Sequence, residues 1–260
     1  MSYLDELFSL DGRVAMAIGA AGVLGGAMAE ALGRAGARVA ILDVDGNAAE
    51  VRARSIAERA GVESLGIAVD ATSEPELRAA LDRVLAEWGR VDVLLNAPGI
   101  NSGTPVLEIG RDEWDRILAV NLTSFFLASQ VIGGRMVEQG EGGSIINISS
   151  ASSGPPLSKV FTYSITKAGI NNMTQFLARE WAPHRVRVNA VAPGFFPAEQ
   201  NRRILTDERV ASIMGHTPMG RFGEPEELAG AVVWLASPAA SGFVTGSLVR
   251  VDGGFTAMTI

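Results

Sequence analysis

The sequence contains no cysteine and only two histidines, His184 and His216. Without thiols the chain can form neither disulfides nor thiolate metal sites, and it has no cysteine nucleophile. Neither histidine lies in an H-E-x-x-H motif or beside paired carboxylates, so we expect no metal site. The lack of cysteine also fits a reducing compartment, and we expect a cytoplasmic protein.

Basic clusters and long apolar runs are scarce as well. The chain carries 22 basic against 29 acidic residues, a net charge of −7, and its longest basic run is Arg202-Arg203. Nucleic-acid-binding proteins usually present a basic face, so nucleic acid is not an expected partner. We find no 18-residue apolar stretch without charges or strong breakers, and no signal-peptide pattern, so no membrane partner is expected either. Neither a G-x-S-x-G elbow nor a Walker A loop occurs, which argues against hydrolase and kinase chemistry.

What the sequence does contain is a regular alternation of apolar runs and amphipathic stretches. The runs are mostly continuous rather than alternating in polarity, which is typical of parallel strands buried on both faces. We predict strands over Val14–Ile18, Arg38–Leu42, Ser64–Val69, Val91–Leu95, Gly143–Ile148, Arg185–Val191 and Ser247–Val251. We predict helices over Leu24–Ala35, Asn47–Ala60, Glu74–Trp88, Asp112–Gln139, Thr162–Ala182 and Glu226–Ala236. This order predicts an α/β fold built on one doubly wound, Rossmann-like, seven-stranded parallel sheet.

No linker divides the chain, so residues 1–260 are expected to form a single domain. The least regular segment, residues 193–223, holds Pro197, Pro218 and several glycines. Long insertions in compact α/β domains are usually functional, and we interpret this segment as a substrate lid.

A glycine-rich turn and an acidic residue indicate a dinucleotide site. The segment Gly19-Ala20-Ala21-Gly22-Val23-Leu24-Gly25-Gly26 follows the first strand and opens the first helix. Glycines there let the backbone approach a pyrophosphate, and the helix N-terminus offers unpaired N–H groups. Asp43 ends the second strand, 18 residues after Gly25. A carboxylate at that point can accept hydrogen bonds from both ribose hydroxyls and repels a 2′-phosphate, which favours NAD over NADP.

Three polar residues indicate proton-transfer chemistry. Tyr163 and Lys167 are separated by one helical turn and share a face. An ammonium near a phenol favours the phenolate, so we expect Lys167 to lower the pKa of Tyr163 and make it an acid/base group. Ser150 lies at the carboxyl end of the fifth strand, where parallel strands face the ligand crevice, and its hydroxyl can bind the reacting oxygen.

Together these motifs resemble those of the short-chain dehydrogenase/reductase family over roughly residues 10–255. The family's glycine turn corresponds to Gly19, Val23 and Gly25, and its strand-four motif to Asn96-Ala97-Pro98-Gly99. Its catalytic Asn-Ser-Tyr-Lys set corresponds to Asn121, Ser150, Tyr163 and Lys167, and its Pro-Gly turn to Pro193-Gly194.

The resemblance implies a role for each matched residue. Tyr163 would be the acid/base, Lys167 would hold the nicotinamide ribose, Ser150 would orient the substrate oxygen, and Asn121 would support a proton-conducting water. It further implies NAD(H) bound by Gly19, Val23, Leu24, Gly25, Asp43, Asp70, Asn96, Gly99, Tyr163, Lys167, Pro193, Gly194 and Phe196. Asp70 would contact the adenine.

The chain departs from the family pattern at three places in the cofactor site. Val23 replaces the middle glycine, which could crowd the pyrophosphate turn or demand a backbone angle that only glycine adopts readily. Ala97-Pro98 replaces an Asn-Ala pair and removes an amide and an N–H group. Ala198 stands where many members carry a threonine that binds the nicotinamide carboxamide.

Softer sequence features point to the substrate. Several segments, including Pro156–Val160, Pro193–Arg202 and His216–Pro225, resemble members known as D-mannonate oxidoreductases or fructuronate reductases. Lys159, Arg202 and Arg203 could bind a substrate carboxylate, and Gln200 and Asn201 could bind sugar hydroxyls.

Alternatives remain open. They are a neutral sugar or polyol dehydrogenase, a 3-oxoacyl reductase, and a non-catalytic NADH-sensing protein. The small-molecule substrate is the principal expected partner. Trp234 and the apolar tail Phe255–Ile260 suggest subunit contacts, and the family is typically tetrameric, so we expect a homo-oligomer, a tetramer or a dimer.

Overall fold

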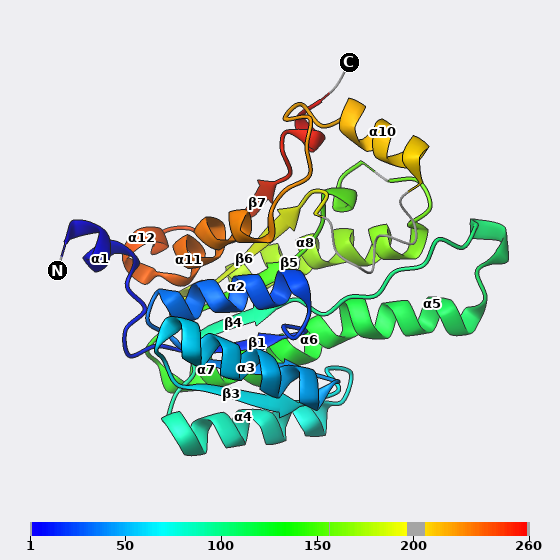
Figure 1. Ribbon diagram of the computed structural model, residues 1–260. Coiled ribbons are helices and arrows are strands. Elements are labelled where there is room, and N and C mark those ends of the chain that lie inside the picture. Colours follow the sequence, from blue (N-terminus) through cyan, green and yellow to red (C-terminus); the bar gives the residue numbers. More distant parts are fainter. Residues whose placement is uncertain (1, 156, 197–205, 259–260) are drawn as a thin grey trace.

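The protein is built around a seven-stranded parallel sheet with strand order β3-β2-β1-β4-β5-β6-β7 (Figure 1). The computed structural model describes residues 2–155, 157–196 and 206–258. The strands span Val14–Ile18 (β1), Arg38–Asp43 (β2), Ser64–Ala68 (β3), Val93–Asn96 (β4), Gly143–Ile148 (β5), Val186–Pro193 (β6) and Leu248–Val251 (β7). The predicted fold class is confirmed: β1, β2, β4, β5 and β6 are almost fully buried, as continuous apolar runs require.

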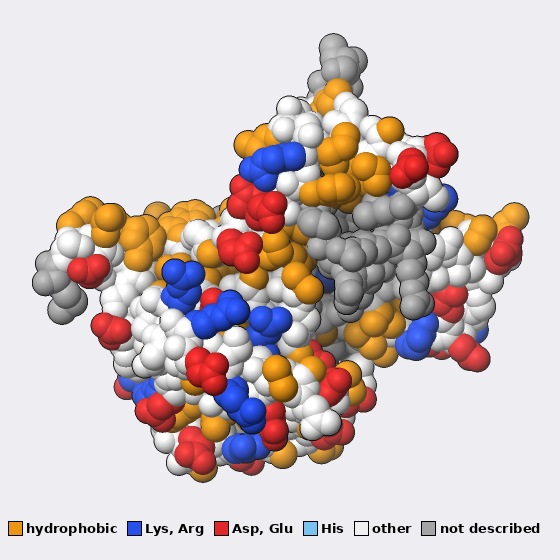
Figure 2. Space-filling model, viewed as in Figure 1, with side chains coloured by type: hydrophobic (Ala, Val, Ile, Leu, Met, Phe, Trp, Pro, Cys, Tyr) orange, Lys and Arg blue, Asp and Glu red, His pale blue; other side chains and the backbone are white. Residues whose placement is uncertain are grey.

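Helices cover the two faces of the sheet in separate layers. One layer holds α2 (Val23–Arg34), α3 (Gly46–Ala60) and α11 (Ala229–Ala236), which pack on β1, β2, β4 and β5 through one apolar cluster. The other holds α4 (Glu74–Trp88), the helical run 111–139 and α8 (Phe161–Trp181), joined by a second cluster. Two further short helices are α1 (Tyr3–Phe8) and α12 (Pro238–Ser241). On the face in Figure 2, charges of both signs are interspersed rather than gathered in a basic stripe.

The run 111–139 is one helix interrupted by two π-helical turns. It consists of α5 (Arg111–Leu118), a π turn (Ala119–Thr123), α6 (Ser124–Ala128), a second π turn (Ser129–Gly133) and α7 (Gly134–Gln139). By length and composition this run would be apolar enough to cross a membrane, and half of its most apolar window is buried inside the protein. Val131, Ile132 and Met136 pack into the second core cluster, which accounts for that apolar side. The first π turn carries Asn121, at the kind of helix irregularity that often marks a functional site.

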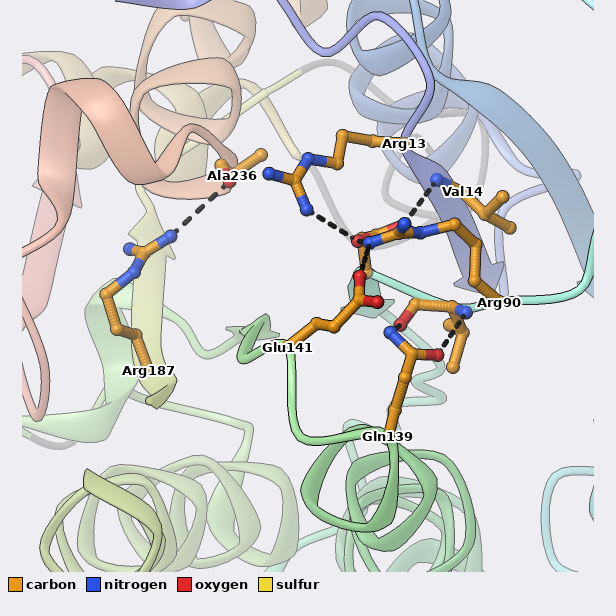
Figure 3. A network of polar contacts seen from close by, with 9 residues as sticks. Arg13, Val14, Arg90, Gln139, Glu141, Arg187 and Ala236 are labelled. Atoms are coloured by element: carbon orange, nitrogen blue, oxygen red, sulfur yellow. Dashed lines mark hydrogen bonds and ion pairs between the residues drawn. The ribbon is translucent and has the colours of Figure 1, made fainter. Parts of the chain in front are cut away.

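An ion-pair network fixes the N-terminal ends of the central strands (Figure 3). Asp92, 4% exposed, accepts hydrogen bonds from Arg13, from Arg90 and from the backbone N–H of Val14, and Arg90 also pairs with Glu141. Burial by itself would raise the pKa of Asp92, but the hydrogen bonds from Arg90 and Arg13 outweigh it, and the pKa lies below its ordinary value. The network therefore ties β1 to β4 at the end opposite the predicted site.

The described part of the expected lid is anchored to the end of the chain. It includes α10 (Asp207–Gly215), and Phe195 and His216 pack edge-on against Phe255 at 5.0 and 4.8 Å between ring centroids. Phe255 is only 6% exposed, and the indole N–H of Trp234 donates to the Ala240 carbonyl. Both aromatic residues thus make contacts within the chain, and the interpretation of Trp234 and the tail as subunit contacts stays a prediction.

Candidate active site

Close backbone packing explains two glycines of the predicted nucleotide turn. Gly19 directly follows β1 with a φ of +68°, and a Cβ there would lie 2.7 Å from the Cα of Pro98. A Cβ on Gly25 would lie 2.6 Å from the Gly19 carbonyl oxygen. Because both approaches involve backbone atoms, neither position accepts a side chain. A Cβ on Gly22, by contrast, would have nothing within 4 Å, so the space beside that residue is open to a pyrophosphate.

Val23 does not strain this turn. It is the first residue of α2, its side chain is 46% exposed, and its φ is not positive. Gly22 precedes it as the N-cap with an ordinary φ of −68°. The expected need for a glycine-only angle at position 23 is therefore wrong: the helix simply begins there. Leu24 turns inward and packs against the core cluster under α2.

The two predicted carboxylates lie at adjacent strand ends. Asp43 ends β2, and its carboxylate accepts hydrogen bonds from the backbone N–H groups of Ala21 at 3.1 Å and Asp45 at 3.3 Å. It is therefore held against the glycine turn. Asp70 is exposed beyond β3, and one of its carboxylate oxygens accepts two bonds from Thr72. This geometry puts Asp43, rather than Asp70, next to the turn.

Asn96, the last residue of β4, and Gly99, in the loop that follows, have different roles. Asn96 is fully buried, and its amide donates to the Phe125 carbonyl and to Asn147, both at 3.4 Å, so its side chain joins β4 to α6 and β5. Its predicted cofactor contact is not supported by the side chain, which has no exposed surface. Gly99 lies beside the catalytic groups, since a Cβ there would be 3.7 Å from the Lys167 amine and 3.9 Å from the Asn121 amide oxygen.

Tyr163 and Lys167 share one face of α8, as their spacing predicts. The Lys167 amine lies 5.5 Å from the centre of the Tyr163 ring and donates a 2.8 Å hydrogen bond to the Ile148 carbonyl at the end of β5. Lys167 is 3% exposed, and this burial lowers its pKa from 10.5 to about 7. The lysine is therefore close to its titration point at neutral pH.

The expected direction of the Tyr163 pKa shift is wrong for the protein by itself. Burial raises the pKa of Tyr163, and the nearby Ser150 side chain offsets only part of that rise. The Lys167 amine faces the ring and the Ile148 carbonyl, and its own charge is weakened by burial. Desolvation of the phenolate consequently outweighs attraction to the ammonium. Tyr163 is held as a neutral phenol, ready to donate a proton.

Ser150 and Asn121 hold this arrangement from two sides. Ser150 follows β5 and caps a short 3-10 turn by accepting a hydrogen bond from the Ser152 N–H. Asn121 is fully buried, and its amide forms two 2.8 Å bonds with the backbone of Ile100, which locks the loop after β4 against the π turn. It also donates to Thr166 on α8 at 3.4 Å. All four predicted catalytic residues thus converge at the carboxyl ends of β4 and β5.

A cavity of about 110 Å³ opens onto Ser150 and Tyr163. Its other lining residues come from the loop after β4, the segment before α8, the insertion and α10: Asn101, Ala151, Ser152, Leu157, Val160, Gly194, Phe195, Phe196, Arg209 and Phe222. A larger cavity, about 550 Å³, lies around Arg13 and Asp92 at the N-terminal ends of the strands and contains none of the predicted site residues. The smaller cavity is therefore the candidate substrate site.

The predicted substrate residues either do not line this cavity or lie outside the described residues. Lys159 is exposed, adopts a positive φ of 65° and does not line the cavity. Gln200, Asn201 and Arg202 lie outside the described residues, as do Arg203 and Ala198. The structure adds Arg209, which sequence reasoning missed although it is a cation within the predicted lid.

Three of the remaining predicted cofactor residues, Pro193, Gly194 and Phe196, lie at the start of the expected lid, residues 193–223. Pro193 ends β6, and Gly194 donates its N–H to the Val251 carbonyl. A Cβ on Gly194 would lie 2.6 Å from the Cα of Asp252, so glycine is needed where the two chain segments cross. Phe196 is buried at the cavity wall and belongs to the first core cluster.

Comparison with known proteins agrees with this site. A family model described as enoyl-(acyl carrier protein) reductase matches residues 19–256. The D-threitol dehydrogenase of Mycolicibacterium smegmatis is 37% identical, over 97% of this chain and 96% of its own. The 5-keto-D-gluconate 5-reductase of Escherichia coli K12 is 35% identical, over 96% of this chain and 98% of its own.

Solved structures show the same fold with cofactors bound. A gluconate 5-dehydrogenase from Burkholderia cenocepacia, in complex with NADP and tartrate, has a TM-score of 0.94 and 33% identity and covers 99% of this chain and 100% of its own. A Haemophilus influenza protein described as a D-mannonate oxidoreductase, with bound NAD, has a TM-score of 0.91 and 30% identity and covers 98% and 99%. The chain belongs to the short-chain dehydrogenase/reductase family. It is an oxidoreductase that acts on CH–OH groups with a nicotinamide cofactor.

Proposed function

We propose that the protein is an NAD(H)-dependent oxidoreductase that interconverts a secondary alcohol and a ketone on a sugar acid of the D-mannonate/D-fructuronate kind. The observation that carries the proposal is that Ser150 and Tyr163 line one cavity at the carboxyl end of β5, with the Lys167 amine 5.5 Å from the centre of the Tyr163 ring. Relatives that act on gluconates, and the structural neighbour described as a D-mannonate oxidoreductase, support the substrate class.

The chain's own residues fit a nicotinamide dinucleotide. Gly19 and Gly25 let the turn pack tightly, nothing lies within 4 Å of a Cβ placed on Gly22, and Asp43 is fixed beside the turn. When bound, the cofactor supplies or accepts the hydride. For reduction, Ser150 orients the substrate carbonyl oxygen by a hydrogen bond, and Tyr163 donates its phenolic proton to that oxygen. For oxidation, the same groups run in reverse, and Tyr163 accepts the alcohol proton.

The substrate proposal is tested by initial rates of NADH oxidation with D-fructuronate, 5-keto-D-gluconate and neutral D-fructose, and of NAD reduction with D-threitol. We expect turnover of at least one sugar acid at a kcat/KM well above that of either neutral compound. The D-threitol dehydrogenase relative favours a second candidate, a neutral polyol dehydrogenase. Turnover of D-threitol or fructose alone would replace the sugar-acid proposal by that candidate.

The NAD preference is tested at Asp43. In Asp43→Ser we expect the ratio of kcat/KM for NADH to that for NADPH to fall about tenfold or more, because the variant loses both the charged ribose acceptor and the repulsion of a 2′-phosphate. Asp45→Asn is the matched control, since it removes a nearby charge but keeps an N-cap residue for α3. A wild-type preference for NADPH, or an unchanged ratio in Asp43→Ser, would contradict the assignment.

Assembly into a homo-oligomer, a tetramer or a dimer, is a further part of the proposal. Exposed apolar side chains on the outer helices support it: Phe126 on α6, Phe161, Ile165 and Phe176 on α8, and Phe243 after α12. Apolar side chains also cover α1 in Figure 2, where Tyr3 and Leu4 are exposed. Exposed aromatic side chains of this kind are enriched at contacts between protein chains. The cytoplasmic location stays a prediction from the sequence.

A further inference from the structure

We propose that Arg209 binds the carboxylate of the substrate and thereby sets the preference of the cavity for an acid over a neutral sugar. The inference rests on the proposed function, because it names the group that recognises that substrate class. Arg209 lines the same cavity as Ser150 and Tyr163, although it comes from α10, more than forty residues further along the chain. The three residues thus share one space.

The position of the Arg209 guanidinium is fixed by neutral partners. One terminal nitrogen donates to the Ser158 carbonyl at 3.1 Å and the other to the Ser158 hydroxyl at 3.4 Å. Thr206 caps α10 by accepting a hydrogen bond from the Arg209 N–H at 3.3 Å, which sets the first turn of the helix. These contacts orient the side chain before any ligand arrives, and preorganisation of this kind lowers the entropic cost of binding.

None of the ion pairs between described residues involves Arg209. The cavity around it has a mixed wall, in which Leu157, Val160 and three phenylalanines stand beside hydroxyl and amide groups. Arg209 is partly buried, so its attraction to an anion is screened less than that of a fully exposed cation. The planar guanidinium matches a carboxylate, which can bind it through two parallel hydrogen bonds.

The neighbouring described cations do not offer the same arrangement. Lys159 is exposed and lies outside the cavity lining. Arg221 already forms two hydrogen bonds with the Glu227 carboxylate, at 2.6 and 2.7 Å. Lys167 is bonded to the Ile148 carbonyl deep beneath Tyr163. In a protein with a net charge of −7, an anionic substrate needs a local cation, and Arg209 meets this requirement at the cavity.

The test compares an acid with its neutral counterpart in Arg209→Gln and Arg209→Lys. For the sugar acid that the wild type reduces best, we expect KM to rise about 30-fold in Arg209→Gln, as the loss of a charged hydrogen-bonding partner implies, with kcat changed by only a few-fold. Arg209→Lys should lie in between, because it keeps the charge but loses the bidentate geometry. The KM for the methyl ester of the same acid should not change. Lys159→Gln is the matched control and should leave the KM for the acid unchanged.

Two readouts keep the outcomes distinct. The thermal melting point and the NADH dissociation constant, measured for each variant, should match the wild type and so exclude a folding defect. An unchanged KM for the acid in Arg209→Gln would overturn this inference while the proposed function stands. An equal rise for acid and ester would also overturn it, because the effect would then be one of shape rather than charge. A wild type that turns over no sugar acid would overturn the proposed function and this inference with it.

Discussion

Replacing Tyr163 by phenylalanine should lower kcat by about 10³-fold, the contribution expected of a positioned general acid, and leave NADH binding close to the wild type. The substitution removes one oxygen and keeps the ring that packs over Lys167. Steady-state rates and a fluorescence titration with NADH would measure the two effects separately. Tyr3→Phe is an internal control, since Tyr3 is the other tyrosine of the chain and is 73% exposed on α1.

Two results would contradict this mechanism. Unchanged turnover in Tyr163→Phe would remove Tyr163 as the acid. A wild type that binds NADH but reduces no carbonyl compound would favour the remaining alternative, a non-catalytic NADH-sensing protein.

The raised pKa of Tyr163 predicts how the rates in the two directions depend on pH. Reduction needs the phenol and should be efficient at neutral pH, whereas oxidation needs the phenolate and should accelerate as the pH rises.

Lys167→Met should abolish turnover and, at the same time, stabilise the cofactor-free protein. Burial lowers the pKa of Lys167 from 10.5 to about 7, so the folded state binds fewer protons than the unfolded state between those two values. The cost that Lys167 adds to folding is therefore absent above pH 10.5 and grows as the pH is lowered to about 7. At about 1.4 kcal/mol per tenfold change in proton affinity, offset by the lost hydrogen bond to Ile148, a gain of roughly 2 kcal/mol is expected at pH 7.

Urea denaturation of wild type and variant at pH 6, 8 and 10 would measure this gain. It should be largest at pH 6 and shrink towards pH 10, because the cost of burying the ammonium disappears once the lysine is neutral in both states. Lys159→Met serves as the control, since Lys159 is the only other lysine and is exposed. Destabilisation of Lys167→Met at every pH would show that the hydrogen bond to the Ile148 carbonyl outweighs the cost of burial.

Local patterns predicted the fold and the catalytic groups well. The ends of β1 and β5 coincide with the predicted ranges, because runs such as Val14–Ile18 are apolar throughout and are bounded by glycine or charged residues. The positions of Ser150, Tyr163 and Lys167 followed from motif spacing, and the structure brings all three together. Information that lies within a few residues of the chain was thus sufficient for these features.

Features that depend on contacts between distant segments could not be predicted from local sequence patterns. Arg209 reaches the cavity because α10 packs near Ser158, a contact across 51 positions. The direction of the Tyr163 pKa shift depends on burial by several elements, which spacing within α8 does not reveal. Lys159 does not line the cavity, and its positive φ could not be foreseen from its residue type. Phe255 looked like an exposed tail residue, but the insertion covers it.

The Arg13–Asp92–Arg90 network has a consequence for how the protein can change through mutation. The ion pairs that tie β1 to β4 lie at the N-terminal ends of the strands, whereas Ser150, Tyr163 and Arg209 lie at their carboxyl ends. Substitutions that reshape the cavity are therefore separated from the contacts that secure the sheet. A laboratory selection for a new substrate could vary the cavity wall and leave the anchoring end untouched, and a search for heat-tolerant variants could work at that end without altering catalysis.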